Sequence, residues 1–196
     1  MTEIETPRGP ARAHLHPVDG AAGGVVLGHG AGGGVGARDL VAATKAANEA
    51  GWSVVLVEQP YRVAGRKSPA PAGHLDEAWT AVLEALRGGE LAGLPVVCGG
   101  RSAGARVACR TAEAVGATGV LCLAFPVHPP GKPEKTRQAG LDAVPVPALV
   151  VQGESDPFGM PTGSATCTVV TVRGNHSLGE FAKVGAAVRD WPPTLV

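Results

Sequence analysis

The sequence predicts an α/β fold, a mostly parallel sheet covered by helices on both faces, without a lid domain. Two observations carry this prediction. Short runs rich in valine and leucine alternate along the chain with segments of helical periodicity, and the runs are almost continuously apolar, as in strands buried on both faces. No insertion between them is long enough to form a lid. We expect strands at residues 24–27, 53–57, 95–98, 120–124, 148–151 and 169–172.

Apolar residues spaced three and four apart mark the helices between these strands. Trp79 and Trp191 fall at core-facing positions of two of them, so we expect both side chains to pack in the core. Residues 11–16 alternate like a half-exposed strand and, with a turn at 7–10, predict a short N-terminal strand pair. The expected helices are residues 40–50, 75–86, 103–115 and 181–191.

Length and composition bound the classes of function. A chain of 196 residues suits one domain, residues 1–196, with a well-buried core. Its 17 basic and 17 acidic residues cancel, which gives no sign of binding to nucleic acid or to an anionic membrane. No apolar run approaches the ~20 residues that span a bilayer, and the N-terminus lacks a signal-peptide pattern. We therefore expect a cytoplasmic protein.

The cysteines and histidines show no metal-binding pattern. None of the four cysteines is spaced as C-x-x-C, so a zinc site is not expected, and buried free thiols are the simplest interpretation. His14 and His16 share one face of their expected strand, but no third ligand is near them in the sequence. We therefore expect neither a metal nor another cofactor.

The pentapeptide Gly100-Arg101-Ser102-Ala103-Gly104 lies between an expected strand and an expected helix. A sharp strand-to-helix turn exposes a serine hydroxyl at its tip, in a strained backbone conformation. The residues two before and two after the serine crowd together there, so glycine fits where a β-carbon would clash. The alternative is a glycine-rich turn that contains a serine by chance, and the context of the motif argues against it.

An acid and a histidine follow the serine in chain order, each after a later strand. Asp156 follows the strand at 148–151, and His176 lies between the last strand and the last helix. Because the carboxyl ends of parallel strands meet at one sheet edge, we expect a nucleophilic serine, a histidine base and an aspartate that orients it. The alternatives are a turn aspartate, the neighbouring acid Glu154 and a helix-capping histidine.

A glycine-rich loop, residues 28–34, follows the first buried strand. Glycines let a backbone approach a substrate closely, and acyl transfer places negative charge on the carbonyl oxygen. We expect the backbone N–H groups of Ala31, in this loop, and of Ala103, just after the serine, to form the oxyanion hole.

The same loop supports a rival interpretation, a dinucleotide-binding protein. It contains G-x-G-x-x-G after a strand, and Glu58 ends the next strand, where such folds bind the ribose. Against this, a strand pair precedes the loop, and the only tyrosine, Tyr61, has a glycine rather than a lysine four residues later. A P-loop is excluded because no Gly-Lys-Ser or Gly-Lys-Thr occurs.

Four stretches carry a resemblance to a known family: Leu27–Gly33, Gly99–Ala108, Phe125–Pro133 and Val151–Gly159. The chain resembles the α/β-hydrolase superfamily, and more narrowly the small lidless hydrolases grouped with dienelactone hydrolase and with testis-expressed and NSL-complex-subunit proteins. The resemblance implies a sheet of about eight strands and a Ser102–His176–Asp156 triad. One departure is that residues 160–166, between acid and histidine, are poor in helix formers, so we expect a short or mobile acid loop.

The resulting hypothesis is a serine hydrolase that cleaves a small ester, thioester or lactone through an acyl-enzyme on Ser102. The alternative is a hydrolase fold with weak or no activity that acts as a binding or scaffold module. We expect a small-molecule acyl substrate and an open pocket whose basic residues favour an anionic substrate, unless they are simply solvated loop positions. The candidate pocket residues are His29, Gly30, Tyr61, Arg62, Arg101 and His128.

Overall fold

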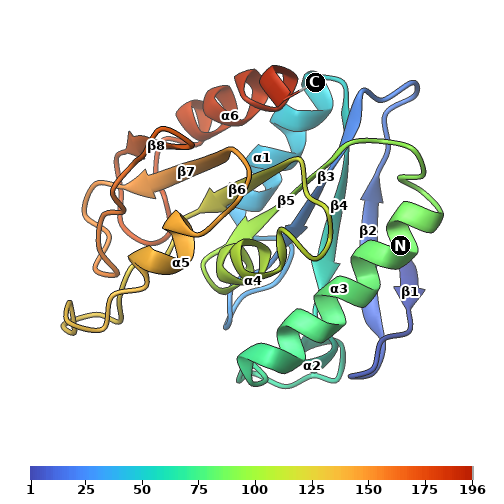
Figure 1. The fold of residues 1–196 in the computed structure, drawn as a ribbon, viewed down its shortest axis with the longest axis horizontal. Helices are drawn as coiled ribbons and strands as arrows, with labels where there is room; N and C mark the ends of the chain where they lie inside the picture. Colours follow the sequence, from blue (N-terminus) through green and yellow to red (C-terminus); the bar gives the residue numbers. More distant parts are fainter. Residues whose placement is uncertain (196) are drawn as a thin grey trace.

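The computed structural model describes residues 1–195 and contains one sheet of eight strands in the order β1-β2-β4-β3-β5-β6-β7-β8 (Figure 1). β1 pairs with β2, and β2 with β4, in antiparallel orientation, and the remaining strand pairs are parallel. The strands are β1 (Thr2–Ile4), β2 (Ala11–His16), β3 (Gly23–Gly28), β4 (Trp52–Glu58), β5 (Val96–Arg101), β6 (Gly119–Leu123), β7 (Ala148–Gly153) and β8 (Cys167–Val172).

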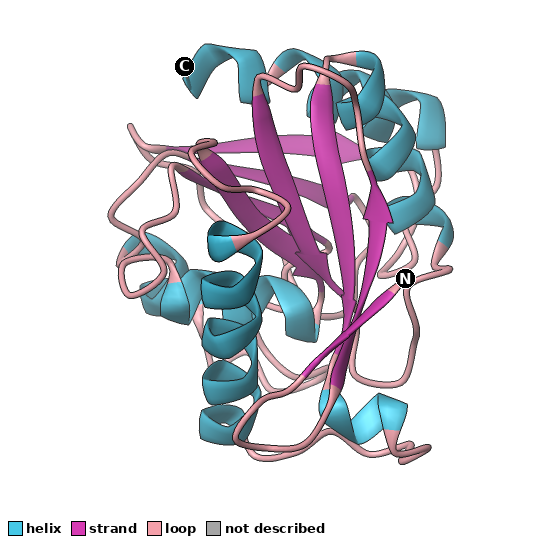
Figure 2. Cartoon of the chain, turned by 90° about the vertical axis from the view of Figure 1, so that its right-hand side faces the viewer, coloured by secondary structure: helices cyan, strands magenta, loops and turns pink. Residues whose placement is uncertain are grey.

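Helices cover both faces of this sheet (Figure 2). α1 and α6 pack against each other on one face, whereas α3, α4 and α5 contribute to the core on the other face. The helices are α1 (Arg38–Glu49), α2 (Pro60–Val63), α3 (Ala72–Gly88), α4 (Ala103–Thr111), α5 (Gln138–Asp142) and α6 (Phe181–Asp190), followed by a 3-10 helix at Pro192–Leu195.

Alternation along the buried strands divides their side chains between two cores. On β3, Val26 packs with the residues of α3 and α4, while its neighbours Val25 and Leu27 pack with those of α1 and α6. Both faces of the strand are therefore apolar, which explains the continuous runs in the sequence. Trp79 is buried in the core beneath α3 and α4, as predicted, and Trp191 is partly buried against the core beneath α1 and α6.

The structure confirms the predicted order of strands and helices, with small differences. The helix expected to reach residue 115 ends at Thr111 and passes into a turn that includes Gly116, whose φ is +60°. The short helices α2 and α5 were not predicted, because four and five residues are too few to produce a helical period. Among the helices of residues 1–195, none is long and apolar enough to cross a membrane.

Candidate active site

Ser102 lies at the sharp turn between β5 and α4, as predicted. Its φ of 51° and ψ of −104° are strained for a residue with a side chain. The flanking glycines allow this turn, because a Cβ on Gly100 would lie 2.5 Å from the Gly28 carbonyl oxygen and 2.9 Å from the carbonyl carbon of Gly104. The crowding expected of the motif is therefore present.

His176, between β8 and α6, contacts both of the other predicted residues. Its Nε2 is 2.8 Å from Ser102 Oγ, and its Nδ1 is 2.8 Å from Asp156 Oδ2. A proton on Nδ1, facing the carboxylate, leaves Nε2 free to accept the serine proton. The Asp156 side chain is 0% exposed and that of His176 is 17% exposed, so the acid is shielded from water while solvent reaches the imidazole.

Hydrogen bonds from its own segment orient the Asp156 carboxylate. The side-chain amide of Gln152 donates to Oδ2 at 2.9 Å, and the Phe158 backbone N–H donates to Oδ1 at 2.8 Å. Each carboxylate oxygen therefore has a fixed partner besides the histidine. Glu154, the alternative acid, is exposed to solvent, and the contact with His176 belongs to Asp156.

The connection from acid to histidine contains no helix in residues 157–166, as the composition predicted. The chain passes from the acid loop directly into β8 and then into the histidine loop. The two loops are pressed together, since a Cβ on Gly153 would lie 2.7 Å from the Gly174 carbonyl oxygen and would overlap the carbonyl of Asn175. A short connection is thus compatible with the acid–histidine contact.

Arg101, a candidate pocket residue, directs its guanidinium toward α1 and the histidine loop. Its terminal nitrogen donates to the His176 carbonyl oxygen at 2.8 Å, and its Nε donates to Asp39 Oδ2 at 2.8 Å. Burial raises the pKa of Asp39, and the Arg101 charge opposes that rise. Asp39 was missed in the sequence, because an acid in the first turn of a helix is common and marks no site.

Aromatic stacking is a second support that the sequence did not reveal. The Phe158 ring lies on the His176 imidazole with ring centroids 4.1 Å apart and an interplanar angle of 29°. The same residue donates its N–H to Asp156. One residue of the acid loop therefore orients both the carboxylate and the imidazole.

His29 is a structural residue of the glycine loop. Its side chain is almost fully buried and both ring nitrogens have partners: Nδ1 lies 2.8 Å from the Gly30 carbonyl oxygen, and the Gln59 N–H donates to Nε2 at 3.1 Å. Accepting at Nε2 requires a neutral imidazole with its proton on Nδ1. Burial lowers the pKa of His29, which favours this neutral form.

The glycine loop approaches Ser102 from the side opposite the acid loop. A Cβ on Gly30 would lie 3.7 Å from the Ser102 Cβ. The Tyr61 hydroxyl donates to the Ala31 carbonyl oxygen at 2.8 Å and so anchors the residue predicted as one oxyanion donor. Ala103, the other predicted donor, is the first residue of α4.

The remaining candidate residues lie at the edge of the active site. The backbone N–H of His128 donates to the Phe158 carbonyl oxygen at 2.9 Å, which places His128 against the acid loop. Arg62 is partly buried, and its guanidinium donates only weakly, at 3.4 Å, to the Arg66 carbonyl oxygen of the same segment. Glu58, the residue on which the dinucleotide alternative depends, lies 3.0 Å from His14 Nε2.

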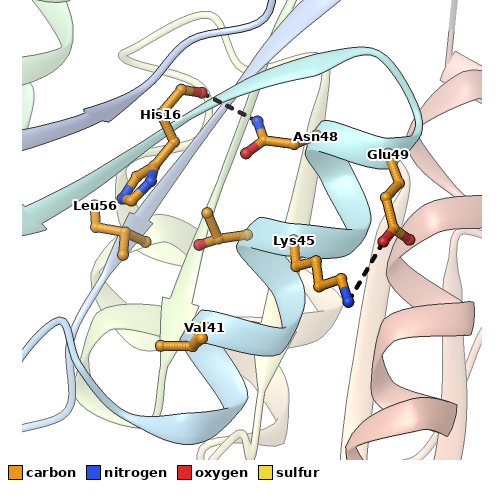
Figure 3. A pocket seen from close by; sticks show the side chains of 7 residues that line it. His16, Val41, Lys45, Asn48, Glu49 and Leu56 are labelled. Atoms are coloured by element: carbon orange, nitrogen blue, oxygen red, sulfur yellow. Dashed lines mark hydrogen bonds and ion pairs between the residues drawn. The ribbon is translucent and has the colours of Figure 1, made fainter.

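A separate hollow of about 550 Å³ lies between α1 and the β2–β4 strands (Figure 3). Its polar groups serve the local structure. Asn48 donates to the His16 carbonyl oxygen at 3.0 Å, Lys45 lies 3.8 Å from Glu49, and the Thr44 hydroxyl donates to a carbonyl of its own helix. No nucleophile and base are paired among the residues that line it, so we assign no chemistry to this hollow.

The four cysteines are free and buried, as predicted. Burial raises the pKa of the Cys98 thiol to about 12, and Cys109 Sγ lies 3.6 Å from Cys122 Sγ. Such thiols act as small apolar side chains. In the part of the chain that the structure describes, no group of three or more His, Cys, Asp or Glu residues is placed to hold a metal ion.

Comparisons with known proteins identify the family. The lidless α/β serine hydrolase of Xanthomonas campestris is 21% identical, with a TM-score of 0.75 over 98% of this chain and 94% of its own. Est1E from Butyrivibrio proteoclasticus is 16% identical, with a TM-score of 0.80 over 99% and 98%. Dienelactone hydrolase from Anabaena variabilis is 17% identical, with a TM-score of 0.74 over 97% and 94%.

No curated protein sequence matches the chain. The family model described as an alpha/beta hydrolase domain matches residues 21–187. The matched range includes the glycine loop, Ser102, Asp156 and His176. It leaves the dinucleotide-binding alternative without support. The chain therefore belongs to the α/β-hydrolase family.

Proposed function

We propose that this protein is a serine hydrolase that cleaves a small ester, thioester or lactone through an acyl-enzyme on Ser102. The observation that carries the proposal is the position of His176, whose two ring nitrogens lie 2.8 Å from Ser102 Oγ and from Asp156 Oδ2. A serine hydroxyl is a weak nucleophile until an adjacent base removes its proton. The short distance between His176 Nε2 and the Ser102 hydroxyl supports this role for the imidazole.

In the first half of the reaction, Ser102 Oγ attacks the substrate carbonyl carbon while His176 Nε2 takes the hydroxyl proton. Asp156 stabilises the imidazolium that forms. Negative charge develops on the carbonyl oxygen, where the N–H groups of Ala103 and Ala31 would stabilise it. His176 then gives the proton to the leaving alcohol or thiol, and the acyl group stays on the serine.

In the second half, a water molecule replaces the leaving group. His176 removes a proton from the water as it attacks the acyl carbon, and the same oxyanion donors stabilise the second tetrahedral intermediate. Collapse of this intermediate returns the proton to Ser102 Oγ and releases the carboxylic acid. Each of the three residues is thereby restored.

A small substrate suits the open site. Ser102 is only half-buried, and in residues 1–195 no lid domain lies over it. Among the structural neighbours, Est1E has been solved with ferulic acid bound, and another is a dienelactone hydrolase. At such low sequence identity these compounds guide the choice of test substrates and do not identify the natural one.

Labelling with a fluorophosphonate probe tests the nucleophile directly. We expect the purified protein to react at Ser102 and the Ser102→Ala variant to remain unlabelled. Ser155→Ala, which changes an exposed serine in the acid loop, is the matched control and should label normally. Labelling that survives Ser102→Ala unchanged would refute the proposal.

Hydrolysis of short-chain nitrophenyl esters tests turnover. A protonated imidazole cannot accept the serine proton, so kcat/KM should fall on acidification. A rate that stays flat from pH 5 to 8 would argue against a histidine base. If no ester in the panel is hydrolysed and Ser102 does not label, the binding-module alternative replaces this proposal.

A further inference from the structure

A groove lined by three arginines lies between α4 and α5, which are neighbours on the same face of the sheet (Figure 1). Arg106 and Arg110 come from successive turns of α4, and Arg137 precedes α5. The volume of the groove is about 200 Å³, which is less than the several hundred Å³ of a pocket for a whole drug-sized ligand. The groove therefore suits one end of a small molecule. Cys109, Phe125 and Thr136 also line it.

Two of the three arginines have no acidic partner in the part of the chain that the structure describes. Arg110 makes two hydrogen bonds to the Asp76 carboxylate, at 2.8 and 2.6 Å. Among the described residues, no carboxylate lies within ion-pair distance of Arg106 or Arg137, and the Arg137 guanidinium donates only to the Pro126 carbonyl oxygen, at 3.2 Å. The groove thus carries excess positive charge where α4 and α5 meet.

Partial burial makes this excess charge unfavourable in the free protein. Arg106 is partly buried, and burial together with the nearby charges of Arg137 and Arg110 lowers its pKa. The carboxylate on α5, Asp142, already accepts a hydrogen bond from Gln138 at 2.7 Å. A negatively charged ligand in the groove would relieve the repulsion between the arginines.

The donors of the groove match an oxyanion. Guanidinium groups bind carboxylate and phosphate oxygens through paired, charge-assisted hydrogen bonds. The Thr136 hydroxyl accepts the Gln138 N–H at 3.2 Å, which leaves its own proton for a ligand. Beside these donors, the buried side chains of Cys109 and Phe125 supply an apolar surface for a short carbon chain.

Hydrogen bonds link two residues that line the groove to the catalytic residues. Arg106 is one helical turn beyond Ser102, and its N–H donates to the Ser102 carbonyl oxygen at 3.2 Å. Phe125 accepts at its carbonyl oxygen from Gln152, the residue whose amide also binds Asp156. A substrate with one end in the groove must therefore extend alongside α4 to reach the nucleophile, and the two acyl lengths of the ester pairs below test this reach.

We propose that the arginine groove binds a carboxylate or phosphate carried by the substrate, so that the enzyme prefers anionic acyl compounds with a short apolar spacer. This inference rests on the proposed serine hydrolase activity and names the substrate class for it. Arg106 and Arg137 are the specificity-determining residues, and Arg110 is held by Asp76.

Matched ester pairs test the preference. For the acyl side, we would compare mono-4-nitrophenyl adipate with 4-nitrophenyl hexanoate, correcting for spontaneous hydrolysis, and repeat the comparison with suberate and octanoate. For the alcohol side, we would compare 4-carboxyphenyl hexanoate with 4-carbamoylphenyl hexanoate. The wild type should prefer the anionic member of at least one pair in kcat/KM, by roughly ten-fold or more for a charged hydrogen-bonded contact.

Arg106→Gln and Arg137→Gln should each remove most of this preference while leaving hydrolysis of the neutral ester within about two-fold, because neither residue contacts the reacting groups. Arg189→Gln, which removes an arginine on α6 paired with Glu49 and Asp190, is the control of equal charge and should retain the preference. Equal kcat/KM for both members of every pair, or a preference that both groove variants keep, would overturn the proposal.

A binding measurement separates failure of the groove from failure of catalysis. Calorimetric titration of adipate, and separately of inorganic phosphate, should give a Kd that rises roughly ten-fold in Arg106→Gln and is unchanged in Arg189→Gln. If no ester is hydrolysed but this binding is found, the hydrolase proposal fails while the anion site stands. If esters are hydrolysed without preference and neither anion binds, the anion site is wrong and the hydrolase proposal stands.

Discussion

The two sides of Ser102 are built by different means. On the glycine-loop side, backbone packs against backbone: Gly100 and Gly104 lie so close to Gly28 that a β-carbon on either would overlap it. On the acid side, the positions depend on side-chain hydrogen bonds, with the His176 imidazole between Asp156 and the serine. The nucleophile is thus placed by the fold itself, whereas the base is placed by a few polar contacts.

This difference predicts how each side responds to mutation. A change that crowds the glycine side should damage folding, because those atoms belong to the packed sheet. A change that removes a polar contact on the acid side should damage turnover and leave most of the stability intact. The four substitutions below test this division, in order of expected effect.

Asp156→Asn should give the largest effect, a loss of about 10⁴ in kcat. Asp156 accepts hydrogen bonds from Gln152, Phe158 and His176, and an amide placed there presents an N–H to one of these donors. The imidazole then loses the tautomer that leaves Nε2 unprotonated. Ester hydrolysis measures the loss, and Asp19→Asn, in an exposed turn, should behave as wild type. A loss of less than ten-fold would show that Asp156 does not orient the base.

Gly104→Ala should lower the free energy of unfolding by about 3 kcal/mol, the upper end for overpacking in a tight core. The new Cβ would lie 2.6 Å from the Gly28 carbonyl carbon and 2.9 Å from the His29 carbonyl oxygen. Urea denaturation measures the change. Gly32→Ala, in the same glycine loop but with no atom within 4 Å of the added Cβ, should stay within about 0.5 kcal/mol of wild type. Equal effects of the two variants would contradict the packing argument.

Arg101→Lys should reduce kcat by roughly ten-fold, with KM and thermal stability nearly unchanged. A lysine keeps the positive charge opposite Asp39 but cannot donate in two fixed directions to Asp39 and to the His176 carbonyl oxygen. Small misplacement of a base is costly in turnover. We therefore regard Arg101 as a positioning residue. A rise in KM with unchanged kcat would instead assign it to substrate binding.

The smallest effect concerns stability and pH on the glycine side. The folded-state pKa of His29 lies below its ordinary value of 6.5 because the ring is buried. The unfolded chain therefore binds a proton that the folded chain rejects, and stability falls as pH decreases below about 6.5, by at most ~1.4 kcal/mol per pH unit for one group. Denaturation of wild type and His29→Gln between pH 5 and 8 measures the difference. Identical pH dependence would show that His29 is not held neutral.

The sequence predicted most of the backbone side of the site. The glycines at 100 and 104, the serine between them and the loop at 28–34 are close to one another along two adjacent strands, so the strand pattern is enough to bring them together. Asp156 and His176 were also predicted, because their positions after β7 and β8 follow from the same rule for parallel sheets.

The supports of the acid side were not predictable in the same way. Asp39, Gln152 and Phe158 lie in different elements, and their roles follow from side-chain directions that periodicity does not specify. Arg101 was expected to face substrate, and only the folded arrangement shows that Asp39 and the histidine loop occupy its guanidinium. The arginine groove was missed for a similar reason, since Arg106 and Arg137 are 31 positions apart.

The short path from Asp156 to His176 has a thermodynamic consequence. Twenty positions separate the two residues, and the strand β8 takes up six of them. Closing a short loop costs less conformational entropy than closing a long one. The difference in free energy is about 0.6 kcal/mol for each halving of the loop length. The short connection thus lowers the entropic cost of holding the His176 imidazole in position next to Asp156.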